Sequence, residues 1–274
     1  MKTDFVQAGA VRLQYFEDGD GQEVVVLVHG YTSSGRVWRL TQEALAGLGI
    51  RSLAISNRGA GDSDRTSSED DYSVRSFARD LYEAVQALGL RNFILCGHSM
   101  GGLTVTQFSL DHPELVKALV LLDSASHDGR ALPRGWEEEM RNRIEQTGAP
   151  RESAERPAPV LDDFRAALQA DIDRNPIERL IGSRRSLSEI RLRSRLTELK
   201  MPVLVVGGDQ DVTVGVDNIL TDFLALPPAN RFLHFFHGTG HSPNVAVAAE
   251  FARLVGSFIR DTLPRLQVTV APGV

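Results

Sequence analysis

Apolar and polar residues follow one another along the chain with two periods, one typical of strands and one of helices. Residues 11–17 alternate apolar and polar side chains, as a half-exposed strand does, whereas residues 23–28 are continuously apolar after Glu23, as in a strand buried on both faces. The other predicted strands are 51–55, 92–96, 116–122, 202–206 and 231–236. The predicted helices are 38–48, 76–88 with Ser76 as its N-cap, 100–111, 216–226 and 244–262. This alternation predicts an α/β fold, with a mostly parallel central sheet and helices on both of its faces.

Residues 128–198 interrupt this alternation of predicted strands and helices. They contain no buried strand pattern, and 28 of the 71 residues from 130 to 200 are charged. Amphipathic helices are predicted at 136–146, 162–173 and 177–199. We therefore expect a helical cap at 128–198, inserted into a core formed by residues 1–127 and 199–274. The alternative is a solvated helical decoration unrelated to a ligand pocket.

The apolar side chains of this insertion have helical spacing, which fits two placements equally well. They could face a pocket or pack onto the core. The residues concerned are Trp136, Met140, Phe164, Leu168, Ile172, Leu180 and Ile181.

The pentapeptide Gly97-His98-Ser99-Met100-Gly101 lies between a predicted strand and a predicted helix. A G-x-S-x-G sequence in that context is a nucleophile elbow, in which a tight turn lifts the serine hydroxyl out of the sheet. Glycines suit this turn because a Cβ at either position would crowd the backbone of the nucleophile. The N-terminus of the following helix favours a developing negative charge beside Ser99.

A serine hydroxyl needs a general base, and the base needs a carboxylate that orients it. In folds with this elbow, the acid and then the histidine follow the serine along the chain. Asp209 and Asp211 follow the strand at 202–206, and His241 follows the strand at 231–236 between glycine-rich neighbours. The chain therefore offers a Ser-Asp-His set in the required order.

With these motifs the chain resembles the α/β-hydrolase-fold serine hydrolases, in particular the capped group of esterases, lactonases and C–C bond hydrolases. The resemblance covers nearly the whole length outside the cap. The motifs that carry it are His29-Gly30, the segment 57–63 (Asn-Arg-Gly-Ala-Gly-Asp-Ser), the segment 97–102 and the loops of Asp211 and His241. One departure is Ser56, where the family usually has an aspartate that structures its loop.

The resemblance implies a role for each matching residue. Ser99 would be the nucleophile, His241 the general base and Asp211 the orienting acid, with backbone N–H groups of Tyr31 and Met100 as the oxyanion hole. Asp209 competes with Asp211, but the family spacing favours Asp211. Asp123 is another candidate, because some family members place the acid after the strand at 116–122.

Other motif residues are expected to be architectural. His29 would shape the oxyanion loop, His98 would pack beside the site rather than act as a second base, and Arg58 would hold its own loop rather than bind substrate.

The resemblance implies a carboxylic ester or lactone hydrolase that forms an acyl-serine intermediate. We expect the small-molecule substrate to be a hydrophobic, medium-sized acyl ester or lactone. A serine at position 99 weighs against dehalogenases and epoxide hydrolases of this fold, which have an aspartate there. A C–C bond hydrolase or lyase with the same triad remains open, although those enzymes commonly have Asn where this chain has His98. A third hypothesis is a ligand-binding, receptor-like relative that turns over slowly.

The composition of the chain limits the kinds of partner and cofactor that we expect. A net charge of −6 argues against nucleic acid, which needs concentrated positive charge. No apolar run is long enough for a bilayer, and no secretory signal precedes the first strand, so we expect a soluble, cytoplasmic protein. The single Cys96 excludes an intramolecular disulfide and is expected to be a small buried residue. The seven histidines show no metal-site spacing, so neither a metal nor a cofactor is expected, and a homodimer is left open.

Overall fold

The computed structural model describes residues 1–147 and 162–269, and it contains one eight-stranded sheet. The strands are β1 (Lys2–Ala8), β2 (Val11–Asp18), β3 (Val24–Val28), β4 (Arg51–Ile55), β5 (Phe93–His98), β6 (Val116–Leu122), β7 (Val203–Gly208) and β8 (Arg231–Phe236). Their order across the sheet is β1-β2-β4-β3-β5-β6-β7-β8. The pairs β1–β2 and β2–β4 are antiparallel, and every other pair is parallel.

The fold class and all seven predicted strands are confirmed, and β4, β6 and β8 have the predicted bounds. Strand β1 was not predicted. It is an edge strand whose residues are mostly exposed. Its polar side chains weaken the apolar alternation on which the prediction depends, and it is held by its antiparallel register with β2.

The helices are α1 (Arg39–Gly47), α2 (Val74–Ala87), α3 (Met100–Asp111), α4 (Trp136–Thr147), α5 (Asp162–Asp173), α6 (Ile177–Glu189), α7 (Val216–Ala225), α8 (Pro243–Ala246), α9 (Ala248–Ser257) and α10 (Leu263–Thr269). Two predictions were wrong in detail. The N-cap of α2 is Ser73, whose hydroxyl accepts from the Ser76 backbone N–H, so the helix begins earlier than expected. The predicted closing helix is broken at Val247, whose backbone (φ −134°) separates α8 from α9.

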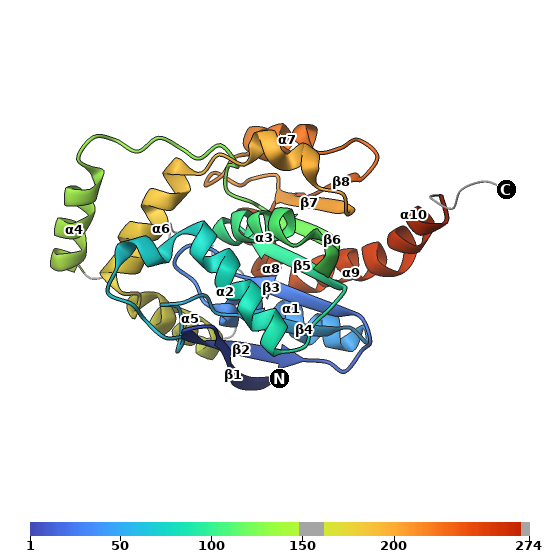
Figure 1. The fold of residues 1–274 in the computed structure, drawn as a ribbon, viewed down its shortest axis with the longest axis horizontal. Coiled ribbons are helices and arrows are strands. Elements are labelled where there is room, and N and C mark those ends of the chain that lie inside the picture. The colour runs from blue at the N-terminus through green and yellow to red at the C-terminus, as the bar shows by residue number, and fades with distance from the viewer. Residues whose placement is uncertain (148–161, 270–274) are drawn as a thin grey trace.

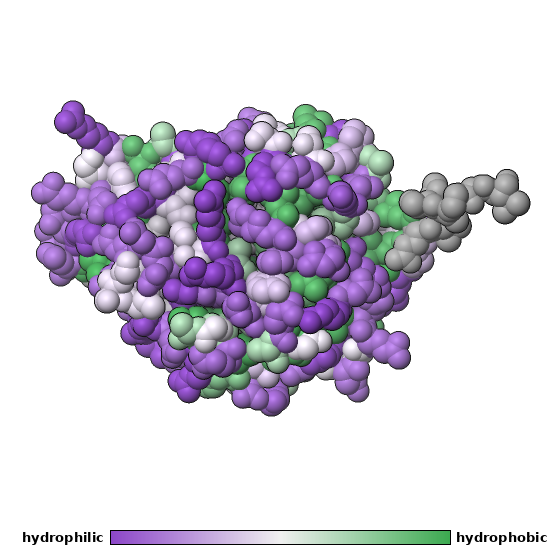
Figure 2. Space-filling model, viewed as in Figure 1, coloured by the Kyte–Doolittle hydropathy of each residue, from purple (hydrophilic) through white to green (hydrophobic). Residues whose placement is uncertain are grey.

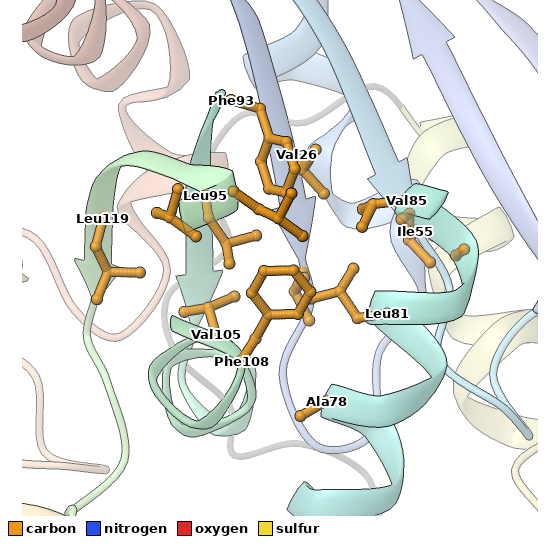
Figure 3. Close-up of a cluster of buried hydrophobic side chains, with 14 of the residues drawn as sticks. Val26, Ile55, Ala78, Leu81, Val85, Phe93, Leu95, Val105, Phe108 and Leu119 are labelled. Carbon is orange, nitrogen blue, oxygen red and sulfur yellow. The ribbon is translucent and has the colours of Figure 1, made fainter. Parts of the chain in front are cut away.

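Helices cover both faces of the sheet, and each face has its own apolar core. Along β3, Val26 and Val28 belong to one core and Val25 and Leu27 to the other, as the period of two requires. The first core is closed by α2, α3 and α7, and Figure 3 shows side chains of α2 and α3 meeting those of the strands. The second core is closed by α1 and α9.

Helices α4, α5 and α6 come from the predicted insertion and lie together at the end of the molecule opposite the C-terminus (Figure 1). The bounds of α5 are those predicted, whereas the stretch 177–199 divides into α6 and a 3₁₀ helix at Arg193–Glu198. Residues 148–161 of the predicted cap lie outside the described residues.

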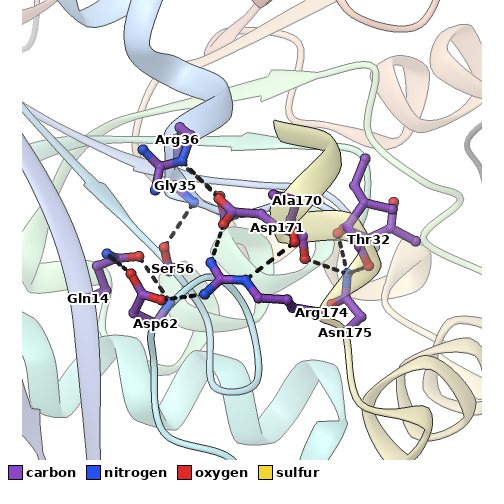
Figure 4. A network of polar contacts seen from close by, with 12 residues as sticks. Gln14, Thr32, Gly35, Arg36, Ser56, Asp62, Ala170, Asp171, Arg174 and Asn175 are labelled. Atoms are coloured by element: carbon purple, nitrogen blue, oxygen red, sulfur yellow. Dashed lines mark hydrogen bonds and ion pairs between the residues drawn. The ribbon is translucent and has the colours of Figure 1, made fainter. Parts of the chain in front are cut away.

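A buried carboxylate joins α5 to the core. Asp171 accepts hydrogen bonds from Ser34 Oγ at 2.6 Å, Arg36 Nε at 3.0 Å and Arg174 Nη2 at 2.6 Å. Arg174 also contacts Asp62 Oδ1 at 2.7 Å, so one network spans α5 and two loops of the core (Figure 4). Several hydrogen-bond donors around one buried carboxylate compensate for its removal from water.

Hydrophilic residues dominate the face seen in Figure 2, with apolar residues scattered among them. None of the helices in the described part of the chain is both long enough and apolar enough to span a bilayer.

Close backbone packing fixes the junction of β5 and α3. A Cβ on Gly97 would lie 2.3 Å from the Gly101 carbonyl oxygen, and a Cβ on Gly101 would lie 2.3 Å from that of Val28. Both contacts involve backbone, so no side-chain rotation relieves them. The helix that follows Ser99 is therefore seated directly on β3.

Two glycines inside helices should respond to alanine with opposite signs. We expect Gly101→Ala to lower the free energy of unfolding by about 1–3 kcal/mol or more, because the added methyl meets backbone. Gly47→Ala in α1 is the matched control, since nothing lies within 4 Å of its Cβ position, and it should raise the free energy of unfolding by about 0.5–1 kcal/mol. Urea unfolding of both variants checks this. A Gly101→Ala protein as stable as Gly47→Ala would show that the junction has room to relax.

Candidate active site

Ser99 is the first residue after β5 and has a strained backbone, with φ 53° and ψ −119°. A non-glycine residue in this region costs on the order of 1–3 kcal/mol and persists only where its surroundings fix it. Here the Ser99 N–H donates to Leu122 O at 3.0 Å, and its carbonyl oxygen accepts from Gly102 and Ala125 N–H at 2.9 and 3.1 Å. The turn places Ser99 on the wall of a pocket.

His241 and Asp211, which come from different loops, form a hydrogen-bonded pair. His241 Nδ1 donates to Asp211 Oδ2 at 2.8 Å, and Asp211 Oδ1 accepts from the N–H groups of Thr213 and Val214 at 2.7 and 3.1 Å. Burial raises the pKa of Asp211, but the His241 ring and the two backbone donors outweigh it and hold that pKa below its ordinary value. The carboxylate is therefore charged at neutral pH and fixes the His241 tautomer that carries its ring proton on Nδ1. His241 lines the same pocket as Ser99.

The two competing acids have different surroundings. Asp209 lies at the surface and pairs with His237, whose Nδ1 is 2.7 Å from Asp209 Oδ2 and whose side chain is 96% exposed. Asp123 is fully buried at the end of β6 with φ 39°, and its Oδ1 accepts from Gly208 N–H at 3.0 Å. Asp123, Asp211 and His241 each place one atom within 4.8 Å of the others. The geometry brings Asp123 near the pair and leaves Asp209 away from it.

The same three residues are the one group with metal-ligand spacing in the described part of the chain. His241 Nδ1 and Asp211 Oδ2 are already hydrogen-bonded to each other. A cation between them would have to displace that shared proton.

The side chain of His98 contacts the backbone of the loop that carries His241. Its Nε2 donates to His241 O at 2.7 Å, and the two rings lie 4.8 Å apart. Burial and the neighbouring His241 lower the pKa of His98 to about 3, so the ring stays neutral and keeps its donor on Nε2. His98 is a packed neighbour, as expected, and it also anchors the loop that carries His241.

His29 shapes the loop that begins at Gly30, as predicted. Its Nδ1 donates to Gly30 O at 2.7 Å, and its Nε2 accepts from Asn57 N–H at 3.0 Å. Burial lowers the pKa of His29 to about 3, in keeping with this fixed tautomer. A Cβ on Gly30 would lie 3.2 Å from that of Ser99, so the loop runs directly beside the serine. Arg58, also as predicted, serves its own loop and donates to both oxygens of Asp80 at 2.6 and 2.5 Å.

Tyr31 lines the pocket, and Met100 is the first residue of α3, so both predicted oxyanion residues lie beside Ser99 in space or in sequence. The loop of Tyr31 is also held from α6. Tyr31 OH donates to Leu180 O at 2.6 Å, and the fully buried Arg179 donates from Nη2 to Ser33 O at 3.4 Å.

Asn175, just before α6, adds a contact to the same loop, with its Nδ2 donating to Thr32 O at 2.7 Å (Figure 4). Sequence reasoning missed Asn175 and Arg179. They belong to no motif, and their partners are more than 140 residues away along the chain.

The pocket is a cavity of about 620 Å³ at the carboxyl ends of the strands. Its wall contains loop residues that follow β3, β5, β6, β7 and β8, together with residues of α6. None of the seven apolar residues of the insertion whose placement the sequence left open lines this cavity, and Met140, Phe164, Leu180 and Ile181 are buried in packed interfaces. For these four residues, packing explains the helical apolar spacing.

Comparison with known proteins gives one family. A family model described as alpha/beta hydrolase fold matches residues 23–245. A 2-hydroxy-6-oxononadienedioate/2-hydroxy-6-oxononatrienedioate hydrolase from Burkholderia vietnamiensis is 27% identical over 270 residues, which cover 91% of each chain. The bifunctional epoxide hydrolase 2 of Sus scrofa is 35% identical over 114 residues, which are 42% of this chain, and the match spans only a fifth of that longer protein.

Among solved structures, an esterase from Exiguobacterium antarcticum superposes with a TM-score of 0.79. It is 21% identical, and the match covers 95% of this chain and all of the esterase. At that identity the likeness concerns the fold alone.

The two neutral, buried histidines His29 and His98 should make the stability of the fold sensitive to acid. In the unfolded chain each takes up a proton near its ordinary pKa of 6.5, whereas in the folded protein each resists protonation down to about pH 3. Each should therefore lower the free energy of unfolding by about 1.4 kcal/mol per pH unit as the pH falls below 6.5.

The measurement is urea unfolding at pH 7.5 and pH 5.0. We expect the loss of stability between these values to be smaller by about 2 kcal/mol in His98→Gln. The control is His237→Gln, at an exposed histidine, which should keep the wild-type loss. An unchanged loss in His98→Gln would mean that this ring is protonated in the folded protein.

Proposed function

The chain belongs to the α/β-hydrolase fold family, and on that premise we propose that it is a serine hydrolase that cleaves a carboxylic ester or lactone through an acyl-serine intermediate. One observation carries the proposal. The hydrogen-bonded Asp211–His241 pair opens onto the same cavity as a serine held in a strained turn. A serine in such a turn, with an oriented imidazole beside the same cavity, is the arrangement that acyl transfer needs.

In the proposed reaction Ser99 Oγ attacks the carbonyl carbon while His241 Nε2 takes the hydroxyl proton. Asp211 stays ionised and stabilises the imidazolium, as its lowered pKa favours. The imidazolium then gives the proton to the leaving alkoxide, and the acyl group remains on Ser99. Water, deprotonated by His241, releases the acid and restores the serine.

The oxyanion would be bound by the backbone N–H groups of Met100 and Tyr31. Met100 begins α3, where the first N–H groups of a helix lack partners within the helix and the dipole favours negative charge. Tyr31 belongs to the loop beside Ser99. One such donor is worth about 3 kcal/mol of transition-state stabilisation.

Residues 128–198 would act as a cap over the core formed by 1–127 and 199–274. The support is that Arg130, Arg184 and Leu187 from this segment line the cavity together with Ser99 and His241. Substrate selection would then depend on the cap, while the chemistry depends on the core.

A C–C bond hydrolase with the same triad is the second candidate. It is favoured by the match to the Burkholderia vietnamiensis hydrolase, which extends over 91% of both chains. Hydrolysis of p-nitrophenyl butyrate, with none of a vinylogous 1,5-diketone, would support the ester hydrolase over this candidate. Hydrolysis of the diketone, with none of p-nitrophenyl butyrate, would make the C–C bond hydrolase the first candidate.

Ser99→Ala should abolish turnover and leave the fold intact. We expect kcat for p-nitrophenyl butyrate to fall at least 1000-fold, because the attacking oxygen is lost, while the midpoint of urea unfolding changes little. Steady-state kinetics and urea unfolding check the two halves. Substantial esterase activity in this variant would remove Ser99 from the mechanism.

Asp211→Asn should lower kcat on the order of 10⁴-fold, because an amide no longer holds the His241 ring in the required tautomer. Asp209→Asn is the matched control on the same loop and should stay within about twofold of wild type, since Asp209 pairs with the exposed His237. Near-normal turnover of Asp211→Asn would transfer the orienting role to Asp123.

A further inference from the structure

The cavity has a charge opposite to that of the whole chain. The chain carries a net charge of −6, yet the described residues of the cavity wall include two arginines, Arg130 and Arg184, and no aspartate or glutamate. A cleft lined by one sign of charge concentrates ligands of the other sign. The described residues of the cavity wall thus carry positive charge, although the chain as a whole is acidic.

Both arginines belong to one part of the wall. On α6, Arg184, Leu187 and Ser188 have the spacing of one helix face, and all three line the cavity. The loop of Arg130 is packed against that helix, because a Cβ on Gly129 (φ 66°) would lie 2.5 Å from Ser188 O. Arg130 therefore enters the cavity beside the end of α6 that carries Arg184.

Arg185 and Arg174 are neutralised by carboxylates, whereas Arg130 and Arg184 have no carboxylate partner among the described residues. Arg185 pairs with Glu69 at 2.7 Å and Glu137 at 3.0 Å, and Arg174 pairs with Asp62 at 2.7 Å. Within residues 1–147 and 162–269, the guanidinium groups of Arg130 and Arg184 have no such carboxylate. Two exposed cations on a cavity wall, with no counter-charge among the described residues, match a ligand that brings its own anion.

Resting on the proposed function, we propose that Arg130 and Arg184 bind a carboxylate of the substrate, remote from the carbonyl that Ser99 attacks. The substrate class is then an anionic ester or lactone. A guanidinium offers paired donors to a carboxylate, and charge-assisted hydrogen bonds of this kind are the stronger ones. The same wall includes apolar residues such as Val37 and Leu187, which offer contacts for a short carbon chain.

The test uses two pairs of esters in which an isopropyl group replaces the carboxylate. Monomethyl glutarate against methyl 5-methylhexanoate places the charge on the acyl side. The butyrate ester of 4-hydroxybenzoate against 4-isopropylphenyl butyrate places it on the leaving group. Initial rates by pH-stat titration give kcat/KM for each ester, and the ratio of anionic to neutral ester is the readout.

We expect the wild type to favour the anionic member of at least one pair by about tenfold or more, with the preference weakened by 0.5 M NaCl because the arginines are exposed. Arg130→Gln and Arg184→Gln together should lower the ratio at least tenfold, mainly through KM for the anionic ester. Arg134→Gln is the matched control, an exposed arginine of the same segment that does not line the cavity, and it should leave the ratio unchanged.

The outcomes separate this inference from the function on which it rests. Hydrolysis that depends on Ser99 but shows no anionic preference, or a preference that survives the double variant, overturns the carboxylate site and leaves the serine hydrolase standing. No hydrolysis of any of the four esters overturns both.

Discussion

The site depends on one constraint, the close approach of backbone where β5 turns into α3. Gly97 and Gly101 leave no room for a Cβ against Gly101 O and Val28 O, and between them Ser99 is held at φ 53°. The strain is offset by the backbone hydrogen bonds of Ser99 with Leu122, Gly102 and Ala125 and by the two apolar cores on either side of the sheet. A serine in this position has its side chain directed by the sheet itself rather than by a mobile loop.

The other parts of the site are loops that need external support, and they receive it from distant elements. His98 is the last residue of β5, and its ring Nε2 donates to the His241 carbonyl oxygen. The strand that ends at the serine therefore also positions the loop of the histidine. The loop of Tyr31 is held on one side by His29. It is also held by Arg179 and the Leu180 carbonyl of α6 and by Asn175, which precedes that helix. Docking of α5 and α6 on the core, through Asp171 among others, thus supports the loop to which the oxyanion donor is assigned.

Hydrophobic periodicity and the elbow motif were sufficient to predict much of the fold and of the candidate site. The continuous apolar runs predicted the buried strands, because strands covered on both faces need apolar residues at every position. The order of Ser99, Asp211 and His241 predicted which loops would meet, because carboxyl ends of parallel strands share one edge of the sheet.

The edge strand β1 was not predicted, because its stability comes from pairing with β2 and not from its own pattern of apolar residues. Asn175, Arg179 and the contact of His98 with the His241 backbone escaped because hydrogen bonds to distant carbonyls leave no local signature. The family spacing favoured Asp211 over Asp209, with only Gln210 between them. The coordinates add that the two carboxylates pair with different histidines.

In the proposed mechanism an imidazole activates the hydroxyl of Ser99. Reaction with a fluorophosphonate, followed by peptide mass spectrometry, measures this activation at the serine itself. We expect one adduct, on the peptide that contains Ser99, and its loss in His241→Gln at the same reagent concentration. An adduct on another residue, or labelling of Ser99 that proceeds undiminished in His241→Gln, would contradict it.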